Sequence, residues 1–114
     1  MQIGQPMVGD VTVAENTGDI TLSKGGDVMI KDKVNSLLQQ GNRKLLLDLG
    51  NVSYVDSAGL GQLVQVYATT SHLGGALKLL RVTRRLKDLL VLTRLLTFFK
   101  SFDDEKDAVA SFNK

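Results

Sequence analysis

The sequence predicts an α/β fold in which a mixed sheet of about five strands packs against about four helices. Short apolar runs bounded by turn residues alternate with longer segments whose apolar residues recur at helical spacing. Strands that alternate with helices in this way form βα crossovers and hence a largely parallel sheet. A pair of alternating segments near the N-terminus adds a hairpin, which makes the sheet mixed.

The N-terminal alternation predicts the hairpin. Val11 and Val13 alternate with polar residues, and Ile20 and Leu22 do so again. The segment between them, 16–19, reads Asn-Thr-Gly-Asp and has the residues of a tight turn. We therefore expect two antiparallel strands here.

A helix and a buried strand follow. Apolar residues recur every three or four positions, at Ile30, Val34, Leu37 and Leu38. Gly41 and Asn42 end that helix. The run 44–49 is almost entirely apolar and is bounded by turn residues, which indicates a strand buried on both faces.

The second half repeats the alternation. A helix is expected to begin at Asp56 or Ser57 and to end at Gly74, and its buried stripe is Leu60, Leu63, Val64 and Tyr67. A strand over 76–80 follows, then a helix over about 83–93 with Leu86, Leu89 and Leu90 facing inward. A last strand is expected over 97–102, and Ser101 or Asp103 caps a final helix. That helix carries Ala108, Val109 and Phe112.

Composition bounds the class of protein. The 114 residues suit one domain spanning 1–114, with its core at about 8–112. The absence of cysteine excludes disulfides and thiolate metal sites and fits a reducing, cytoplasmic compartment. The N-terminus lacks the pattern of a signal peptide, and the longest apolar stretch, 89–99, is too short to insert across a membrane.

Charge singles out no partner, because the net charge is +2. Basic residues gather in the second half, and only Asp88 lies among them: Lys78, Arg81, Arg84, Arg85, Lys87, Arg94 and Lys100. We interpret them as the solvated face of a helix and not as a nucleic-acid site, because no aromatic residues are interleaved. The acidic residues 103–107 lack the spacing and the glycine of a calcium loop, so no metal is expected.

The most informative segment runs from Asp48 to Gly61, where a buried strand gives way to a helix. Ligands and partners of α/β sheets usually meet the loops at this end of the strands, so Ser57 is expected to be exposed there. Gly59 and Gly61 are poor helix formers, which suggests that something approaches the backbone closely. From the residues alone, Asp56-Ser57 is most simply a helix cap.

This segment, followed by Gly74-Gly75-Ala76-Leu77-Lys78-Leu79-Leu80, resembles the STAS domain of bacterial anti-sigma factor antagonists. The family pattern is a hydrophobic strand, a short loop and Asp-Ser-x-Gly-Leu-Gly opening a helix. The resemblance covers 8–112 and implies a STAS-type sheet. Two departures are Ala58, where serine or threonine is commoner, and the loop 24–28, which differs from the family's usual sequence.

The resemblance implies a non-enzymatic switch without a cofactor. Ser57 matches the phosphorylated serine of the family, and the implied partner surface is Asp56, Ser57, Ala58, Gly59, Leu60 and Gly61. The implied partners are an anti-sigma factor with serine-kinase activity and a phosphatase. Unphosphorylated protein would bind the anti-sigma factor and release a sigma factor.

Other functions stay open at this stage. The same domain could serve another signalling complex or a lipid-transport complex. A hydrolase built on Ser57 and His72 is disfavoured, because the two residues would lie about 20 Å apart along one helix. The oligomeric state is also open, since the segment 92–99 is more apolar than one small sheet needs: Leu92, Leu95, Leu96, Phe98 and Phe99.

Overall fold

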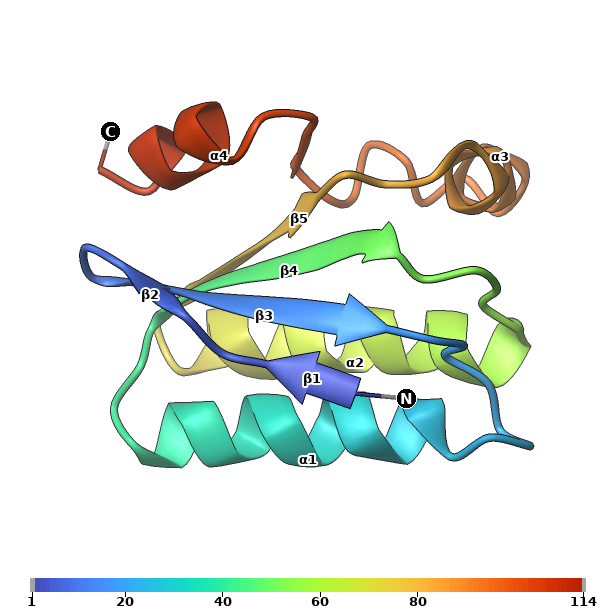
Figure 1. Ribbon diagram of the computed structural model, residues 1–114, viewed down its shortest axis with the longest axis horizontal. Helices are drawn as coiled ribbons and strands as arrows, with labels where there is room; N and C mark the ends of the chain where they lie inside the picture. Colours follow the sequence, from blue (N-terminus) through green and yellow to red (C-terminus); the bar gives the residue numbers. More distant parts are fainter. Residues whose placement is uncertain (1, 114) are drawn as a thin grey trace.

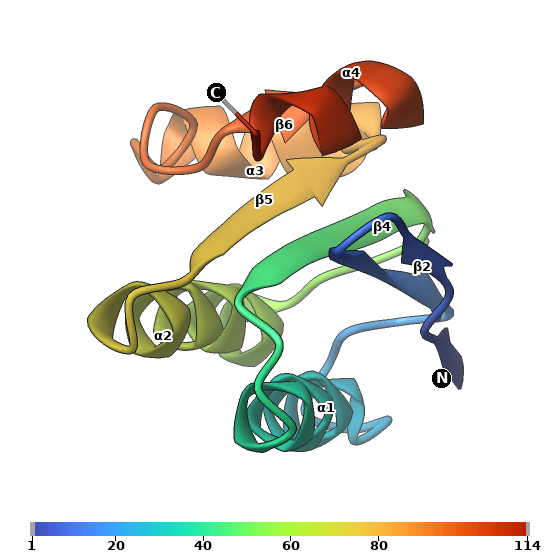
Figure 2. The same ribbon diagram turned by 90° about the vertical axis from the view of Figure 1, so that its left-hand side faces the viewer.

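The computed structural model describes residues 2–113. Its elements are β1 (Gln2–Gly4), β2 (Met7–Val8), β3 (Val11–Thr17), α1 (Gly26–Gln39), β4 (Lys44–Asn51), α2 (Ser57–His72), β5 (Ala76–Leu80), α3 (Arg84–Leu92), β6 (Ser101–Phe102) and α4 (Glu105–Ser111). Helices α1 and α2 lie under one face of the sheet and α4 lies over the other (Figures 1 and 2). The buried residues of α3, Leu86 and Leu90, join the same hydrophobic cluster as those of α1 and α2.

The sheet is mixed, as the sequence predicts. Its strand order is β1-β3-β4-β5-β6, and β2 also pairs with β3. Strands β3, β4, β5 and β6 are parallel, whereas β1 and β2 run antiparallel to β3. The described residues contain six strands, one more than the approximate number expected.

The position of β4, between two hydrophobic clusters, explains why its sequence is so apolar. Leu45, Leu47 and Leu49 belong to the larger hydrophobic cluster, which lies against α1 and α2. Leu46 points to the opposite face and joins a smaller cluster with Val13 and with Ala108 of α4. Both faces of the strand are therefore covered, as the sequence predicts.

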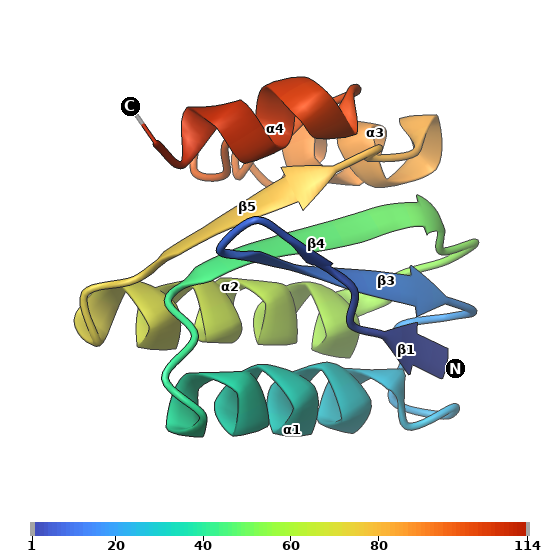
Figure 3. The same ribbon diagram turned by 60° about the vertical axis from the view of Figure 1, so that its left-hand side comes forward.

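The predicted hairpin is wrong in its position. The antiparallel partners of β3 come from the N-terminal side, where the chain turns at Gly9 with a φ of +62° (Figure 3). Ile20 instead forms an isolated parallel bridge with Val55, and Leu22 is 69% exposed. The two apolar residues therefore do not mark a strand. Ile20 is buried in the core, whereas Leu22 lies exposed in a loop.

The C-terminal elements also differ in detail. Only Ser101 and Phe102 pair within the predicted last strand, because Phe99 turns into the core and its ring lies 5.4 Å from that of Tyr67. The cap of α4 is Asp104, whose carboxylate accepts from the Lys106 N–H, and not Ser101 or Asp103.

Lys78 and Arg81 do not belong to a solvated helix face, so that interpretation is wrong for these two residues. Both make contacts that hold the fold together. Lys78 is buried on β5, where its Nζ donates to the carbonyl and the hydroxyl of Ser111 and lies 4.5 Å from the centre of the Phe112 ring. Arg81 donates to Asp48 over 2.6 Å, so its counter-charge is Asp48 and not Asp88.

Candidate functional site

The site begins where the segment 19–21 passes between the N-terminal ends of α1 and α2. Gly26 of α1 and Gly59 of α2 both face the backbone of this segment, and a Cβ on either residue would overlap a carbonyl oxygen there, that of Asp19 or Ile20 respectively. Ile20 is fully buried between them. The two glycines thus permit both helices to close on one stretch of backbone.

The close approach predicted from the glycines is confirmed at Gly59. The approaching group is the backbone of Ile20 in this same chain. A Cβ added at Gly61 would meet no atom within 4 Å, so nothing in the described chain requires a glycine there. Sequence reasoning did not connect Ile20 with the site. The pair Gly25-Gly26 was the available signal, because adjacent glycines before a helix often mark a close backbone contact.

Asp56 links the start of α2 to the loop that contains Leu22. Its carboxylate accepts from the Gly59 N–H over 2.8 Å, which makes Asp56 the N-cap of α2. The second carboxylate oxygen accepts from the Leu22 N–H over 3.0 Å. The backbone N–H of Asp56 donates to the Ile20 carbonyl. One side chain therefore starts the helix and fastens the loop beside it.

Ser57 is the first residue of α2 and is exposed, as the sequence predicts. No hydrogen bond within residues 2–113 occupies its hydroxyl. Exposed Leu22 belongs to the loop that Asp56 holds, and half-exposed Tyr54 precedes Ser57 by three positions. The hydroxyl thus lies at an accessible helix start, and the segments that adjoin it in the fold carry exposed apolar residues.

The remaining predicted contact residues differ in accessibility. Gly61 is exposed, Ala58 is half-buried, and Gly59 and Leu60 are buried against the chain itself. A protein that docks here would touch Ser57 and Gly61 directly. Gly59 and Leu60 would support that surface from beneath.

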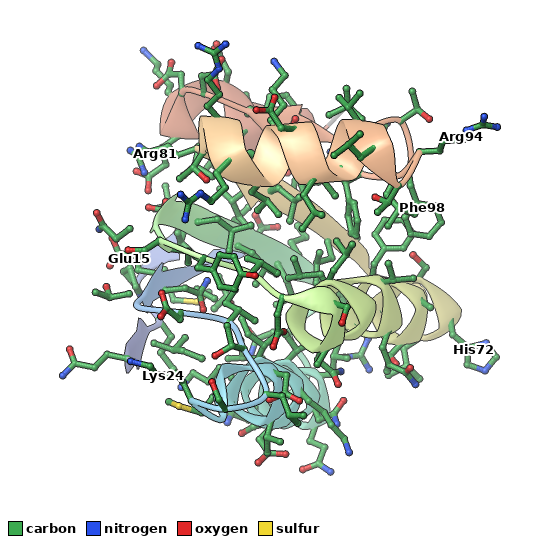
Figure 4. The ribbon with its side chains drawn as sticks, turned by 90° about the vertical axis from the view of Figure 1, so that its right-hand side faces the viewer. Glu15, Lys24, His72, Arg81, Arg94 and Phe98 are labelled. Carbon is green, nitrogen blue, oxygen red and sulfur yellow. The ribbon has the colours of Figure 1, made fainter. Side chains whose placement is uncertain are left out.

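The structure separates Ser57 from His72, the two residues from which a hydrolase was considered. His72 is the last residue of α2, at the opposite end from Ser57 (Figure 4). Among the described residues, no group of acidic or histidine side chains is arranged to hold a metal ion.

Hydrogen bonding sets the charge of Asp56. The Gly59 N–H, and after it the Leu22 N–H, hold the pKa of the Asp56 carboxyl below its ordinary value. The side chain is consequently an anion at neutral pH, and both of its oxygens have partners.

We expect a pH dependence of stability that Asp56→Asn reduces. The folded-state pKa lies below the unfolded one, so the unfolded chain binds more protons, and this stabilisation is lost as pH falls through the folded-state pKa. Asparagine caps a helix well but does not titrate. Urea unfolding between about pH 5 and pH 2 should show a shallower acid loss in Asp56→Asn than in the wild type.

Asp10 supplies the control for this experiment. Its pKa is lowered by the hydrogen bond from Lys44, so the wild-type acid loss contains a second contribution of the same sign. The double variant with Asp10→Asn should lose less stability in acid than either single variant. Identical pH profiles for Asp56→Asn and the wild type would contradict the assignment.

The family is decided by comparison with known proteins. The model of the STAS domain matches residues 22–108, which is most of the chain. The chain belongs to the STAS domain family. The anti-sigma-B factor antagonist of Bacillus subtilis is 34% identical over 92 residues, which cover 75% of this chain and 84% of that protein. This STAS domain is therefore a member of the anti-sigma factor antagonist family.

Solved structures support the fold. A Thermotoga maritima protein assigned to the anti-sigma factor antagonists superposes with a TM-score of 0.89 at 23% identity, covering 98% of this chain and 95% of that one. SpoIIAA of Bacillus in its phosphorylated form gives 0.73 at 17% identity, covering 96% and 98%. The STAS-type sheet predicted from the sequence is thus confirmed for this chain.

No helix within residues 2–113 has the length and apolar character that crossing a membrane requires.

Proposed function

We propose that this STAS domain binds an anti-sigma factor with serine-kinase activity, and that phosphorylation of Ser57 ends the binding. Unphosphorylated protein would occupy the anti-sigma factor and free a sigma factor in the cytoplasm, and a phosphatase would restore the hydroxyl. The observation that carries the proposal is the exposed Ser57 hydroxyl, free of hydrogen bonds within the described chain, at the first residue of α2.

The position of Ser57 suits a modification that leaves the fold intact. A phosphate there adds about 1.5 to 2 negative charges beside the N–H groups of the first helical turn, which favour an anion. Neighbouring Asp56 opposes it, since the Asp56 carboxylate is already charged. SpoIIAA, which shares this fold, has been solved in both its unphosphorylated and phosphorylated forms.

The surface around Ser57 explains why the charge would release a partner. Leu22 is 69% and Tyr54 48% exposed, so a docked protein can cover apolar side chains close to the serine. A phosphate within that contact would have to lose its hydration, and the neighbouring Asp56 carboxylate gives it a like charge and not a counter-charge. Burying an unpaired charge costs several kcal/mol, and each 1.4 kcal/mol weakens binding about tenfold.

Ser57→Asp should weaken binding to the anti-sigma factor by at least about tenfold, and Ser57→Ala should bind as the wild type does. Calorimetric titration of the purified pair measures both affinities. Ser71→Asp is the matched control, because Ser71 is exposed near the other end of α2. The same charge placed there should not change the affinity.

The phosphorylation step is tested separately. Incubation of the pair with ATP, followed by mass spectrometry, should place one phosphate on the peptide that contains Ser57, and Ser57→Ala should abolish it. Tight binding by Ser57→Asp, or phosphate on another serine, would contradict the proposed switch.

A further inference from the structure

Strand β5 has an open edge where the chain expected to pair with it turns away. Ser101 and Phe102 pair with Leu79 and Leu80, so the ladder between β6 and β5 covers only the end of β5. Within residues 2–113, the segment 97–100 forms no ladder with the first half of β5. That half therefore lies beside a segment that diverges from it.

Alternation along β5 identifies the backbone groups that face this edge. The Ala76 N–H donates to the Arg43 carbonyl on the β4 side, whereas the Leu79 N–H donates to the Lys100 carbonyl on the β6 side. Successive residues of a strand direct their N–H and C=O groups to opposite sides. Leu77, two residues before Leu79, therefore directs both groups to the β6 side, and no hydrogen bond within residues 2–113 engages them there.

A pocket of about 350 Å³ lies at this edge. Its lining comes from the end of the turn and the start of β5 (75–78), from the diverging segment (Thr97, Phe98 and Lys100) and from α2 (Tyr67 and Ser71). The Leu77 side chain belongs to the hydrophobic core, so the backbone edge of Leu77 is the part of this residue that meets the pocket. A donor and an acceptor thus face the pocket side by side.

Aromatic rings supply the apolar part of the lining. The ring centres of Tyr67 and Phe98 lie 4.6 Å apart, and Phe98 is 41% exposed although it packs on Tyr67. The hydroxyls of Ser71 and Thr97 also belong to lining residues, and no hydrogen bond within the described chain engages them. An apolar wall with a few polar groups that fix orientation is typical of small-molecule sites.

We propose that this pocket binds a small aromatic carboxamide. The ligand N–H donates to the Leu77 carbonyl, the ligand carbonyl accepts from the Leu77 N–H, and the aromatic ring packs against Phe98. A carboxamide carries a donor beside an acceptor, which complements the two groups that one extended residue directs to the same side. The site lies by the C-terminal half of α2, whereas Ser57 begins that helix, so the proposed switch and this site are independent.

Two other occupants fit less well. An extended strand of a partner would have to run past Leu77, and the segment 97–100 blocks its path because it returns to β5 at Lys100. A carboxylate offers two acceptors and no donor, so one of its oxygens would face the Leu77 carbonyl. The exposed cation of Lys100 does not remove that conflict.

The test is a nuclear magnetic resonance titration of the full chain with benzamide. We expect saturable shifts with a Kd on the order of 1 mM, as suits a ligand of this size, largest for the Leu77 amide and the amides of 97–100. Hydrogen exchange of the Leu77 amide should slow about tenfold when benzamide is present at ten times its Kd.

Two related ligands test the hydrogen-bond pattern. N,N-dimethylbenzamide keeps the ring and the carbonyl but has no N–H, and benzoate keeps the ring but has acceptors only. Each leaves the Leu77 carbonyl without a donor, so each should bind at least about tenfold more weakly than benzamide.

One variant tests the ring contact. Phe98→Leu keeps an apolar side chain but removes the ring, and should weaken benzamide about threefold or more. Tyr54→Leu is the matched control, because Tyr54 is a half-exposed aromatic residue outside this pocket, and should leave the affinity unchanged. Urea unfolding checks that both variants fold, and the exchange of the Leu77 amide tests the site in the unaltered chain.

Three outcomes would overturn the inference. They are an absence of shifts at about 20 mM benzamide, equal affinity for benzoate or N,N-dimethylbenzamide, and shifts centred away from 76–78 and 97–100.

Discussion

Replacing Gly59 by alanine is expected to lower the free energy of unfolding by about 3 kcal/mol, the upper part of the range for overpacking a core. The new Cβ would overlap the carbonyl oxygen of Ile20 and lie 2.9 Å from the Ile20 Cγ2. The Ile20 backbone has little room to move, because Gly26 faces it from α1 and its carbonyl accepts from the Asp56 N–H. Alanine's better helix propensity, worth about 1 kcal/mol, does not offset such a collision.

Gly61→Ala is the matched control on the same helix, two residues away. Nothing lies within 4 Å of its added Cβ, so the variant should gain up to about 1 kcal/mol from helix propensity. Urea unfolding of the wild type and both variants, followed by circular dichroism, measures the differences. Equal stabilities of Gly59→Ala and Gly61→Ala would show that the close contact with Ile20 does not exist in solution.

Ile20→Ala is expected to lower the free energy of unfolding by about 2–5 kcal/mol. Ile20 is fully buried, bridges to Val55, and fills the space that Gly59 leaves open. Removing its side chain leaves a cavity where both helices begin, which neighbouring backbone cannot easily close. Ile20→Val should cost about 0.5–1.5 kcal/mol, because it removes a single methyl group.

The control for Ile20 is Val28→Ala in α1. Val28 is 51% exposed, so its truncation should change the free energy of unfolding by less than about 0.5 kcal/mol. Calorimetric melting of the three variants should give the lowest melting temperature for Ile20→Ala, an intermediate one for Ile20→Val and the highest for Val28→Ala. If Ile20→Ala were as mild as Val28→Ala, the segment 19–21 would not be the anchor of the site.

The contact between Ile20 and Gly59 also bears on the proposed switch. Asp56 bonds to both Leu22 and Gly59, so the serine is presented by a unit that includes the loop and both helix ends. A gentle change such as Ile20→Val should therefore weaken the anti-sigma contact less than Ser57→Asp does, because it leaves the charge of that surface unaltered.

Much of the fold followed from local patterns. The periodicity of 30–38 and 60–67 predicted the two helices under the sheet, and the apolar run 44–49 predicted a strand covered on both faces. The start of α2 at Asp56-Ser57 and the exposure of Ser57 were also correct. The motif in this segment identified the family.

The hairpin and the role of Gly59 could not be predicted in the same way. The pattern Val11, Val13, Ile20, Leu22 satisfied the rule for alternation, yet the strand partner of β3 is the N-terminal segment. The glycine at position 59 indicated a close approach, but the approaching group is Ile20, nearly forty positions earlier. Likewise, nothing in the pattern of 97–102 indicated that its first half diverges from β5 beside Leu77.

By itself the sequence determined the alternation of helices and strands from α1 onward, the start of α2 and the exposed serine on it, because caps and periodicity depend on residues a few positions apart. The tertiary structure alone decided what pairs with β3, what closes on Gly59 and where the pocket beside Leu77 lies. Those features depend on groups far apart in the chain, such as Leu22 and Asp56, which are separated by 34 positions and joined by one hydrogen bond.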